Sequence, residues 1–233
     1  MHPSLVYTFP MSRTHLIVLL VLVLAIGIGV AFYLVHSERS AMQGNTEQTP
    51  SLTGQAIFTD GEDGFSIRYP EEYQTDDTFM TFYHLPANWR VNAAPHATGT
   101  PVIALIGYRT QSENTYPRYF DAEVRIGVSS DPKEVARCEQ VGNHEGETAL
   151  PDTVIGGATF KVFAFESAGM MQYLKGISYR TVHEGKCFAI EQLQTGSSYR
   201  EDPMSSKDIP DTTLQAHYNA LADVVKTFSF SRP

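Results

Sequence analysis

Twenty consecutive residues near the start of the chain, Leu16 to Val35, are apolar and carry no charge. At about 1.5 Å per residue, a helix of this length spans about 30 Å, the thickness of the hydrocarbon core of a bilayer. Polar residues flank the run on both sides. The pattern therefore predicts a single N-terminal transmembrane helix, with the membrane contacted through Leu16–Val35.

Two other interpretations of this run stay open. A cleaved signal peptide has a shorter apolar region and a small-x-small site, for which the run offers only Val35-His36-Ser37. A buried core helix needs a polar stripe, which the run lacks. Arg13 and Arg39 place one basic residue on each flank, so charge hardly decides the orientation. The short head and the large domain that follows favour an N-inside, C-outside signal anchor.

The pattern divides the chain into four parts. Residues 1–15 form a short N-terminal segment, and residues 16–36 form the transmembrane helix. Residues 37–55 lack hydrophobic periodicity and are rich in Ser, Thr, Gln and Gly, which predicts a flexible linker. Residues 56–233 are expected to fold as one α+β domain, because a segment of that length can bury a core of its own.

Strand signals dominate this domain, as alternating polar and apolar residues or short apolar runs between turn residues. The predicted strands are Phe65–Tyr69, Thr78–Leu85, Val102–Tyr108, Phe120–Val128 and Ala158–Glu166. Two more, Gln172–His183 and Lys186–Leu193, are expected to form a hairpin around Glu184-Gly185.

Helix signals are few. Asp131 and the proline after it predict an N-cap and a first helical position for a helix over Lys133–Val141. A second helix, capped by Asp211, is expected to run to about Lys226. Phe228-Ser229-Phe230 is then expected to close the chain as a short strand. Antiparallel strands with two helices predict the α+β class, an antiparallel sheet flanked by helices.

Two local patterns resemble PsbP-like domains. Gly64 to Pro70 reads Gly-Phe-Ser-Ile-x-Tyr-Pro, and the last predicted helix ends in Val-x-x-Phe-x-Phe at Val225–Phe230. The resemblance implies an α/β/α sandwich around an antiparallel sheet, used for binding or assembly and usually without catalysis. No catalytic residues carry over from it. Many such domains have a tryptophan after the Tyr-Pro, whereas this chain has Tyr73 there and its one tryptophan is Trp89.

The charge balance is acidic, with 26 Asp and Glu against 17 Lys and Arg and a net charge of −9. An acidic domain has no electrostatic reason to bind nucleic acid, so no nucleic-acid partner is expected. Two cysteines are too few for a disulfide scaffold or a four-thiolate zinc site.

The two cysteines are candidates for a disulfide. Cys138 lies in the first predicted helix and Cys187 early in a late strand, where a helix packed on the sheet could bring them together. Outside the cytoplasm such a pair is expected to be oxidised. The bridge would close a loop of about fifty residues and contribute about 3–4 kcal/mol. Two separate buried thiols and a cysteine nucleophile are the alternatives left open.

No pattern predicts a catalytic residue, a cofactor or a metal ion. The histidines lack metal-ligand spacing, and the glycine-rich stretches lack the lysine and helix of a phosphate loop. Asp60, Glu62 and Asp63 crowd three carboxylates into four positions, but not with the spacing of a calcium loop.

Two long polar connections, residues 88–101 and 196–210, are candidate binding loops. They contain residue types that are enriched in binding hot spots, namely Trp89, Arg90, Tyr199 and Arg200. Ordinary solvated loops are the alternative.

Together these patterns predict a membrane-anchored domain outside the cytoplasm, periplasmic or extracellular, that serves as a non-catalytic binding or assembly module with a protein partner near the membrane. Two alternatives remain: a hydrolase-type enzyme with an unrecognised site in the same domain, and a structural subunit of a membrane complex. A deep cleft with convergent His, Asp or Glu and shifted pKa values would favour the enzyme.

Overall fold

A computed structural model describes most of the chain beyond residue 53. The described residues are 54–81, 85–93, 96–110, 120–142, 146–198 and 209–231. They all belong to one compact unit, Thr53–Pro233. Among the described residues, no helix is long and apolar enough to cross a membrane. The predicted membrane helix at Leu16–Val35 lies outside them, as does all of the predicted linker except its last two residues.

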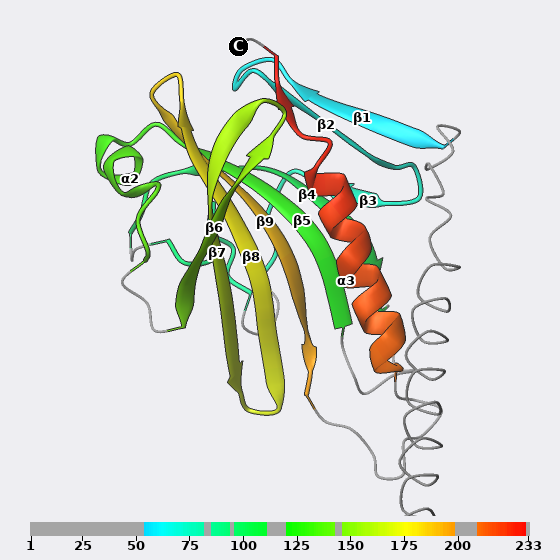
Figure 1. Ribbon diagram of the computed structural model, residues 1–233. Coiled ribbons are helices and arrows are strands. Elements are labelled where there is room, and N and C mark those ends of the chain that lie inside the picture. Colours follow the sequence, from blue (N-terminus) through cyan, green and yellow to red (C-terminus); the bar gives the residue numbers. More distant parts are fainter. Residues whose placement is uncertain are drawn as a thin grey trace, which may run out of the picture. The chain divides into compact units, whose positions relative to one another are not determined.

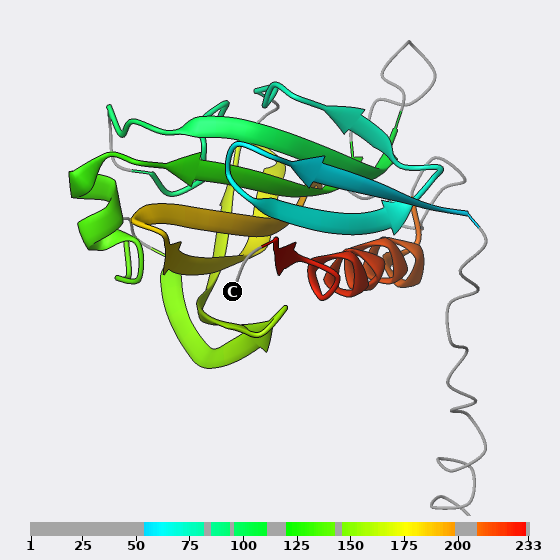
Figure 2. The same cartoon turned by 90° about the horizontal axis from the view of Figure 1, so that it is seen from above.

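The described residues form two antiparallel sheets and two helices (Figure 1). The smaller sheet has the strand order β1 (Gln55–Asp60), β2 (Phe65–Pro70), β10 (Ser229–Phe230). The larger sheet has the order β3 (Gln74–Asp76), β4 (Thr100–Arg109), β5 (Phe120–Ser129), β9 (Lys186–Ser197), β8 (Gln172–His183), β7 (Ala158–Gly169), β6 (Glu147–Ile155). The helices are α2 (Pro132–Arg137) and α3 (Asp211–Val225), which lie at opposite ends of the domain (Figure 2). The expected α+β class is thereby confirmed.

The main core lies on one face of the larger sheet. In β5, alternate residues from Phe120 to Val128 point to this face, because successive side chains of a strand point to opposite sides. There they pack with the apolar stripe of α3, which includes Leu221 and Val225, and with Phe65 of the smaller sheet. The helix and the smaller sheet therefore cover the same face.

Several predicted elements are confirmed. The strands expected around Phe65–Tyr69, Val102–Tyr108, Phe120–Val128 and Ala158–Glu166 are β2, β4, β5 and β7. The predicted hairpin is formed by β8 and β9, with His183 paired to Lys186. Its turn has positive φ at Glu184 (47°) and Gly185 (75°), which is the backbone shape of a two-residue type I′ turn.

The strand predicted over Thr78–Leu85 is wrong for its described residues. Asp76 Oδ1 accepts hydrogen bonds from both the backbone N–H and the hydroxyl of Thr78, each at 2.9 Å. This side-chain turn ends the short strand β3 and releases the following residues from the sheet. Strands β1, β3 and β6 were not predicted. Most of β6 is exposed, so its sequence shows no alternation of buried and exposed positions.

The helix ends also differ from the prediction. The first helix, expected over Lys133–Val141, ends at Arg137, although Asp131 caps it as predicted by accepting from the Lys133 N–H at 2.8 Å. In the second helix Asp211 is the first helical residue, and Pro210 occupies the N-cap position.

The smaller sheet contacts the larger one at the β6–β7 turn, which gives a test of the packing. Gly156 and Gly157 both have positive φ, so an alanine at either is expected to cost about 1–2 kcal/mol. A Cβ at Gly156 would also lie 2.7 Å from Ser229 Cα, whereas one at Gly157 meets nothing within 4 Å. We expect Gly156→Ala to cost about 1–3 kcal/mol more than Gly157→Ala. Urea unfolding followed by the fluorescence of the buried Trp89 measures the difference. Equal losses would contradict this packing.

Candidate functional site

The face of the larger sheet opposite α3 is unusually polar for an interior. The described residues between 77 and 99, namely 77–81, 85–93 and 96–99, lie over this face and bury Phe79, Leu85 and Trp89; we call them the strap. Residues that are paired across antiparallel strands share a face, so the sheet residues beneath the strap follow from the register. We call the ionisable groups between strap and sheet the charged face: Arg109, Asp121, Glu123, Arg125, Glu147, Arg180 and Glu191 from the sheet, Arg90 from the strap and Glu134 from α2.

Arg125 fastens the first half of the strap. Its Nη1 donates to the carbonyl oxygen of Pro86 at 2.7 Å, and its Nη2 donates to that of Met80 at 2.8 Å. Its Nε forms an ion pair with Glu123, and its Cζ lies 4.7 Å from the centroid of the Phe79 ring. One buried guanidinium thus binds two backbone carbonyls, a carboxylate and an aromatic ring.

Two glutamates fasten the second half of the strap. Glu191 Oε2 accepts the backbone N–H of Val91 at 2.8 Å. Glu147 Oε1 accepts from Asn92 Nδ2 at 3.3 Å, and the same carboxylate forms an ion pair with Arg180 in which neither side chain is exposed. The strap is therefore attached to the sheet mainly through its own backbone and through charged sheet residues.

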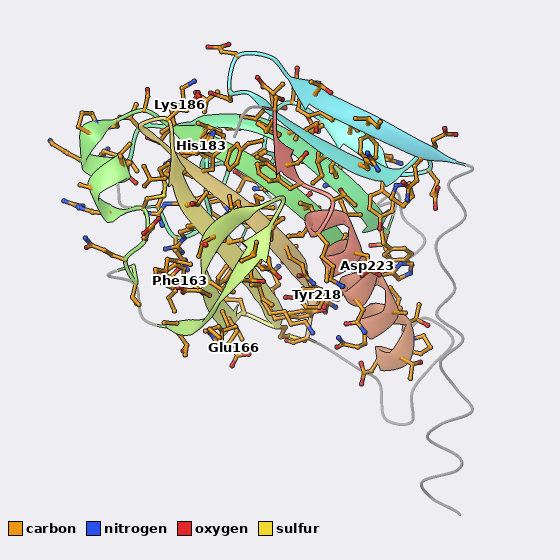
Figure 3. All side chains as sticks on the ribbon, turned by 45° about the horizontal axis from the view of Figure 1, so that its top comes forward. Phe163, Glu166, His183, Lys186, Tyr218 and Asp223 are labelled. Carbon is orange, nitrogen blue, oxygen red and sulfur yellow. A yellow bond between two sulfur atoms is a disulfide. The ribbon has the colours of Figure 1, made fainter. Side chains whose placement is uncertain are left out.

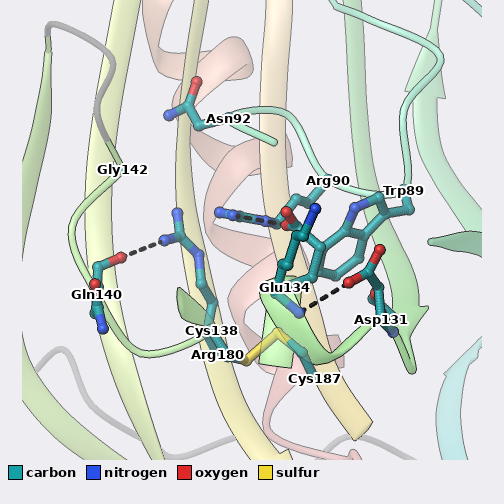
Figure 4. A network of polar contacts seen from close by, with 12 residues as sticks. Trp89, Arg90, Asn92, Asp131, Glu134, Cys138, Gln140, Gly142, Arg180 and Cys187 are labelled. Carbon is teal, nitrogen blue, oxygen red and sulfur yellow. Dashed lines mark hydrogen bonds and ion pairs between the residues drawn. A yellow bond between two sulfur atoms is a disulfide. The ribbon is translucent and has the colours of Figure 1, made fainter. Parts of the chain in front are cut away.

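Helix α2 closes the other side of this network (Figure 4). Glu134 of α2 forms an ion pair of 3.4 Å with Arg90 of the strap, and both side chains are 4% exposed. Arg180 Nη1 donates to the carbonyl of Gln140, just beyond the helix, at 3.1 Å. A disulfide joins Cys138 at the end of α2 to Cys187 at the start of β9, with a Cα–Cα distance of 5.5 Å and both residues fully buried.

The buried carboxylates have shifted pKa values. Burial raises the pKa of Glu123 to about 7, an effect larger than the lowering by Arg125. Burial likewise raises the pKa of Glu191, against the lowering by the Val91 N–H and Arg180. Burial acts to raise the pKa of Glu147, but the hydrogen bonds from Arg180, Gly142 and Asn92 and the charge of Arg180 together lower it below its usual value.

Some polar atoms of the charged face have no hydrogen-bond partner among the described residues. They are Trp89 Nε1, Arg90 Nε and Nη1, and Glu191 Oε1. The atoms of Trp89 and Arg90 are hydrogen-bond donors, and the Glu191 oxygen is an acceptor. Such groups together can hold an internal water or a small polar molecule. The charged face can therefore bind such a molecule, but its contacts in the described residues are to the strap, to α2 and the residues after it, and between strands of the sheet.

A separate pocket of about 280 Å³ lies where the β1–β2 turn meets the ends of β4 and β5. Four carboxylates line it, from Asp60, Glu62, Asp63 and Asp77, together with the ammonium group of Lys186. Lys186 Nζ forms a 2.7 Å ion pair with Asp63 Oδ1. The excess of negative charge favours cationic groups in this pocket. Among the described residues, these carboxylates included, no three His, Cys, Asp or Glu side chains are grouped so that they could hold a metal ion.

The structure joins Cys138 and Cys187, the two cysteines that the sequence analysis paired. Trp89 and Arg90, from the first candidate binding loop, are only 1% and 4% exposed. Trp89 fits against two glycines, Gly99 and Gly127, at which any Cβ would overlap it. Both side chains are therefore buried in the domain, and a binding role of this loop stays a prediction. Tyr199 and Arg200 lie outside the described residues.

The sequence analysis missed the charged face altogether. In β5, Asp121, Glu123 and Arg125 alternate with apolar residues, a pattern that normally indicates a solvent-facing side. The signal that could have found the site is the apolar content of the strap, since Phe79, Leu85 and Trp89 need a surface to cover.

Comparisons with known proteins give a limited result. No protein-family model and no curated protein matches the chain. Among solved structures the chain is similar to the cyanobacterial PsbP protein CyanoP of Synechocystis sp. PCC 6803, with a TM-score of 0.33, 10% identity, and coverage of 81% of this chain and 99% of that one. It is also similar to LpqN, involved in cell envelope biogenesis of Mycobacterium tuberculosis, with a TM-score of 0.32, 11% identity, and coverage of 75% and 89%.

A PsbP protein is thus among the structures that the chain resembles, and PsbP-like domains are the family that the pattern at Gly64–Pro70 indicated. At TM-scores below 0.5 and identities near 10%, neither match says anything about function or site residues.

Glu147 and Glu191 give a matched pair of variants. We expect Glu147→Gln to lower the free energy of unfolding by about 3–5 kcal/mol at pH 7, because Arg180 loses its counter-charge in the interior. We expect a smaller loss from Glu191→Gln, because the amide oxygen still accepts the Val91 N–H.

The pH dependence of the two variants should differ in sign. The pKa of Glu147 is lowered from 4.5, so its contribution to stability is present above pH 4.5 and is lost as the pH falls below it. The pKa of Glu191 is raised from 4.5, so its contribution declines as the pH rises above that value. Glu147→Gln should therefore flatten the plot of stability against pH below pH 4.5. Glu191→Gln should flatten the same plot above pH 4.5. If the stability of both variants depended on pH in the same way, the opposite pKa shifts of Glu147 and Glu191 would be contradicted.

Proposed function

We propose that this chain is a membrane-anchored protein whose folded domain lies outside the cytoplasm, in the periplasm or the extracellular space, and works as a non-catalytic binding or assembly module. The observation that carries the proposal is the buried disulfide between Cys138 and Cys187. The apolar run Leu16–Val35 supplies the anchor in this proposal, and a protein near the membrane is the expected partner.

The disulfide supports the location because structural disulfides persist in oxidising compartments. Cys138 and Cys187 are 49 residues apart and fully buried, so the bridge joins two distant parts of the fold and is shielded from reductants. A domain of this kind, preceded by an apolar segment long enough to span a bilayer, fits a signal anchor with the N-terminal segment inside.

The binding role is supported by what the charged groups do in the described structure. Shifted carboxylate pKa values often mark catalytic sites, and Glu123 and Glu191 have them. Here, however, Arg125 and Glu191 bind the backbone of the strap, which covers them. The charged face thus stabilises a rigid scaffold, and this favours a binding module over the alternative of a hydrolase.

The oxidation state of the cysteines in intact membranes tests the proposed location. Free thiols are alkylated before lysis, and peptides that contain Cys138 and Cys187 are identified by mass spectrometry. We expect a Cys138–Cys187 bridge and no alkylated form. A Cys138→Ser, Cys187→Ser double variant should lose about 3–4 kcal/mol of stability. Two alkylated cysteines in the native chain would place the domain in a reducing compartment and overturn the proposal.

The binding role needs its own control. The full chain and a soluble fragment of residues 54–231 are each used to capture proteins from solubilised membranes. If the domain is a binding module, the same partner is captured by both. If a partner is captured only by the full chain, the chain is a structural subunit that assembles through its apolar segment. Capture of nothing by either would contradict both roles.

A further inference from the structure

Three hairpins of the larger sheet have two-residue turns with positive φ at both positions. The β6–β7 turn is Gly156-Gly157 (56° and 85°), and the β8–β9 turn is Glu184-Gly185 (47° and 75°). The β7–β8 turn is Met170-Met171 (50° and 63°), between the paired residues Gly169 and Gln172. Turns of this shape favour Asn, Asp and Gly, because other side chains are strained there. The β7–β8 turn is the one of the three without a glycine.

The two methionines are also exposed. Met170 is 94% exposed and Met171 is 59% exposed, so the turn has backbone strain and uncovered apolar side chains at the same place. The Met171 carbonyl accepts the Ser198 N–H at 2.8 Å, which holds the turn in this shape but leaves both methionine side chains uncovered. Strained backbone persists where a site uses it, and methionine adapts its shape to irregular apolar surroundings. This combination indicates a contact made outside the domain.

The hairpin projects the two methionines away from the other turns. Strands β7 and β8 pair along their length up to the turn. Figure 3 shows Glu166, close to the tip, at one end of the sheet, and His183 and Lys186, at the β8–β9 turn, at the other end. A strand rises by about 3.3 Å per residue, so twelve-residue strands such as these separate the two ends widely.

The residues behind the tip carry no charge. No charged residue lies between Glu166 and Lys175 along the chain. Gln172 directly follows the methionines, and Tyr173 after it packs on the main core, where its hydroxyl accepts from Gln194 Nε2 at 3.0 Å. Next come Lys175 and Glu166, which are paired across the strands and together neutral. The tip therefore offers an uncharged end of the hairpin, at which the two methionines are the exposed apolar side chains.

We propose that the β7–β8 tip inserts Met170 and Met171 into the interfacial region of the lipid bilayer that carries the anchor. This inference rests on the proposed function, because it needs the domain to be tethered to that bilayer. Residues 37–54 separate the predicted membrane helix from β1, and a chain of that length spans up to about 60 Å when extended. A contact through two side chains is weak by itself, but tethering gives it a high effective concentration.

The net charge of −9 also restricts the kind of lipid contact. Anionic headgroups repel an acidic domain, so the insertion must depend on apolar contact at the uncharged tip. Vesicles of phosphatidylcholine alone are therefore the appropriate probe.

The test uses the full chain reconstituted in phosphatidylcholine vesicles. Met171→Cys is labelled with an environment-sensitive fluorophore, which reacts there because the native cysteines are joined to each other. Glu184→Cys is the matched control, since it has the same turn shape at the opposite end of β8. We expect the label at position 171 to emit further to the blue and to be quenched several-fold more strongly by spin-labelled lipid than the label at 184. Equal quenching at the two positions would overturn the insertion.

A carbonate wash separates this inference from the anchor. If the protein stays with the vesicles and both labels are equally exposed, the tip proposal fails and the anchor stands. If the protein is washed off, both fail. A label at 171 that is protected in native membranes but not quenched by lipid would mean a protein contact and would overturn lipid insertion.

A second variant distinguishes lipid insertion from a role in folding. Replacing Met170-Met171 by Asn-Gly gives the turn its preferred residues, so the thermal midpoint is not expected to fall. With the fluorophore on Gln172→Cys in both backgrounds, the exchange should abolish most of the quenching by spin-labelled lipid. Unchanged quenching would contradict insertion through the methionines, and a lowered midpoint would assign them a structural role instead.

Discussion

The interaction on which this structure depends is the attachment of the strap to the sheet by buried charges. A buried charge is tolerated when it is paired and hydrogen-bonded, and each charge on this face meets that condition by binding the strap, α2 or a neighbouring charge. Arg125 shows the principle most completely, because its three nitrogens bind two strap carbonyls and Glu123. Without the strap, water would take the place of these carbonyls as the partner of Arg125. Without the charges, the backbone of the strap would lack hydrogen-bond partners in the interior.

The two faces of the larger sheet are therefore stabilised in different ways. On one face α3 and the smaller sheet bury apolar side chains, a contact whose strength depends on area. On the other face two smaller apolar clusters, which include Trp89 and Leu85, lie beside directional hydrogen bonds and ion pairs, and the directional contacts specify one position of the strap. The disulfide adds a covalent link on this second face, because it joins the end of α2, whose Glu134 binds Arg90, to the sheet at Cys187.

The sequence predicted the strands that are largely buried and missed β1, β3 and β6, which have few buried residues. Strand β2 and the β8–β9 hairpin combine apolar residues with flanking turn residues, and both were found. Strand β6 is mostly exposed and shows no such pattern, and the run after Asp76 has strand-like composition but is released by a side-chain turn. Local composition cannot show that turn, because it depends on one carboxylate bonding two donors of Thr78.

The candidate site was harder to predict for a similar reason. A charged residue at every second position of β5 indicates water in front of it, unless another segment is known to cover that face. Trp89 and Arg90 have the composition of a hot spot, yet both are buried. Gly99 leaves room for the indole ring of Trp89, and Gly127 leaves room for its backbone carbonyl. The pairing of the cysteines could be inferred because it needed only a helix packed on the sheet and an oxidising compartment.

Amide hydrogen exchange of the full, oxidised chain tests most directly whether the charged face makes the strap part of the rigid domain. The Val91 amide, which Glu191 binds, should exchange as slowly as amides in the central strands β5 and β9. Exchange at Val91 as fast as at the exposed turn residue Glu62 would mean that the strap opens freely, and would contradict this account.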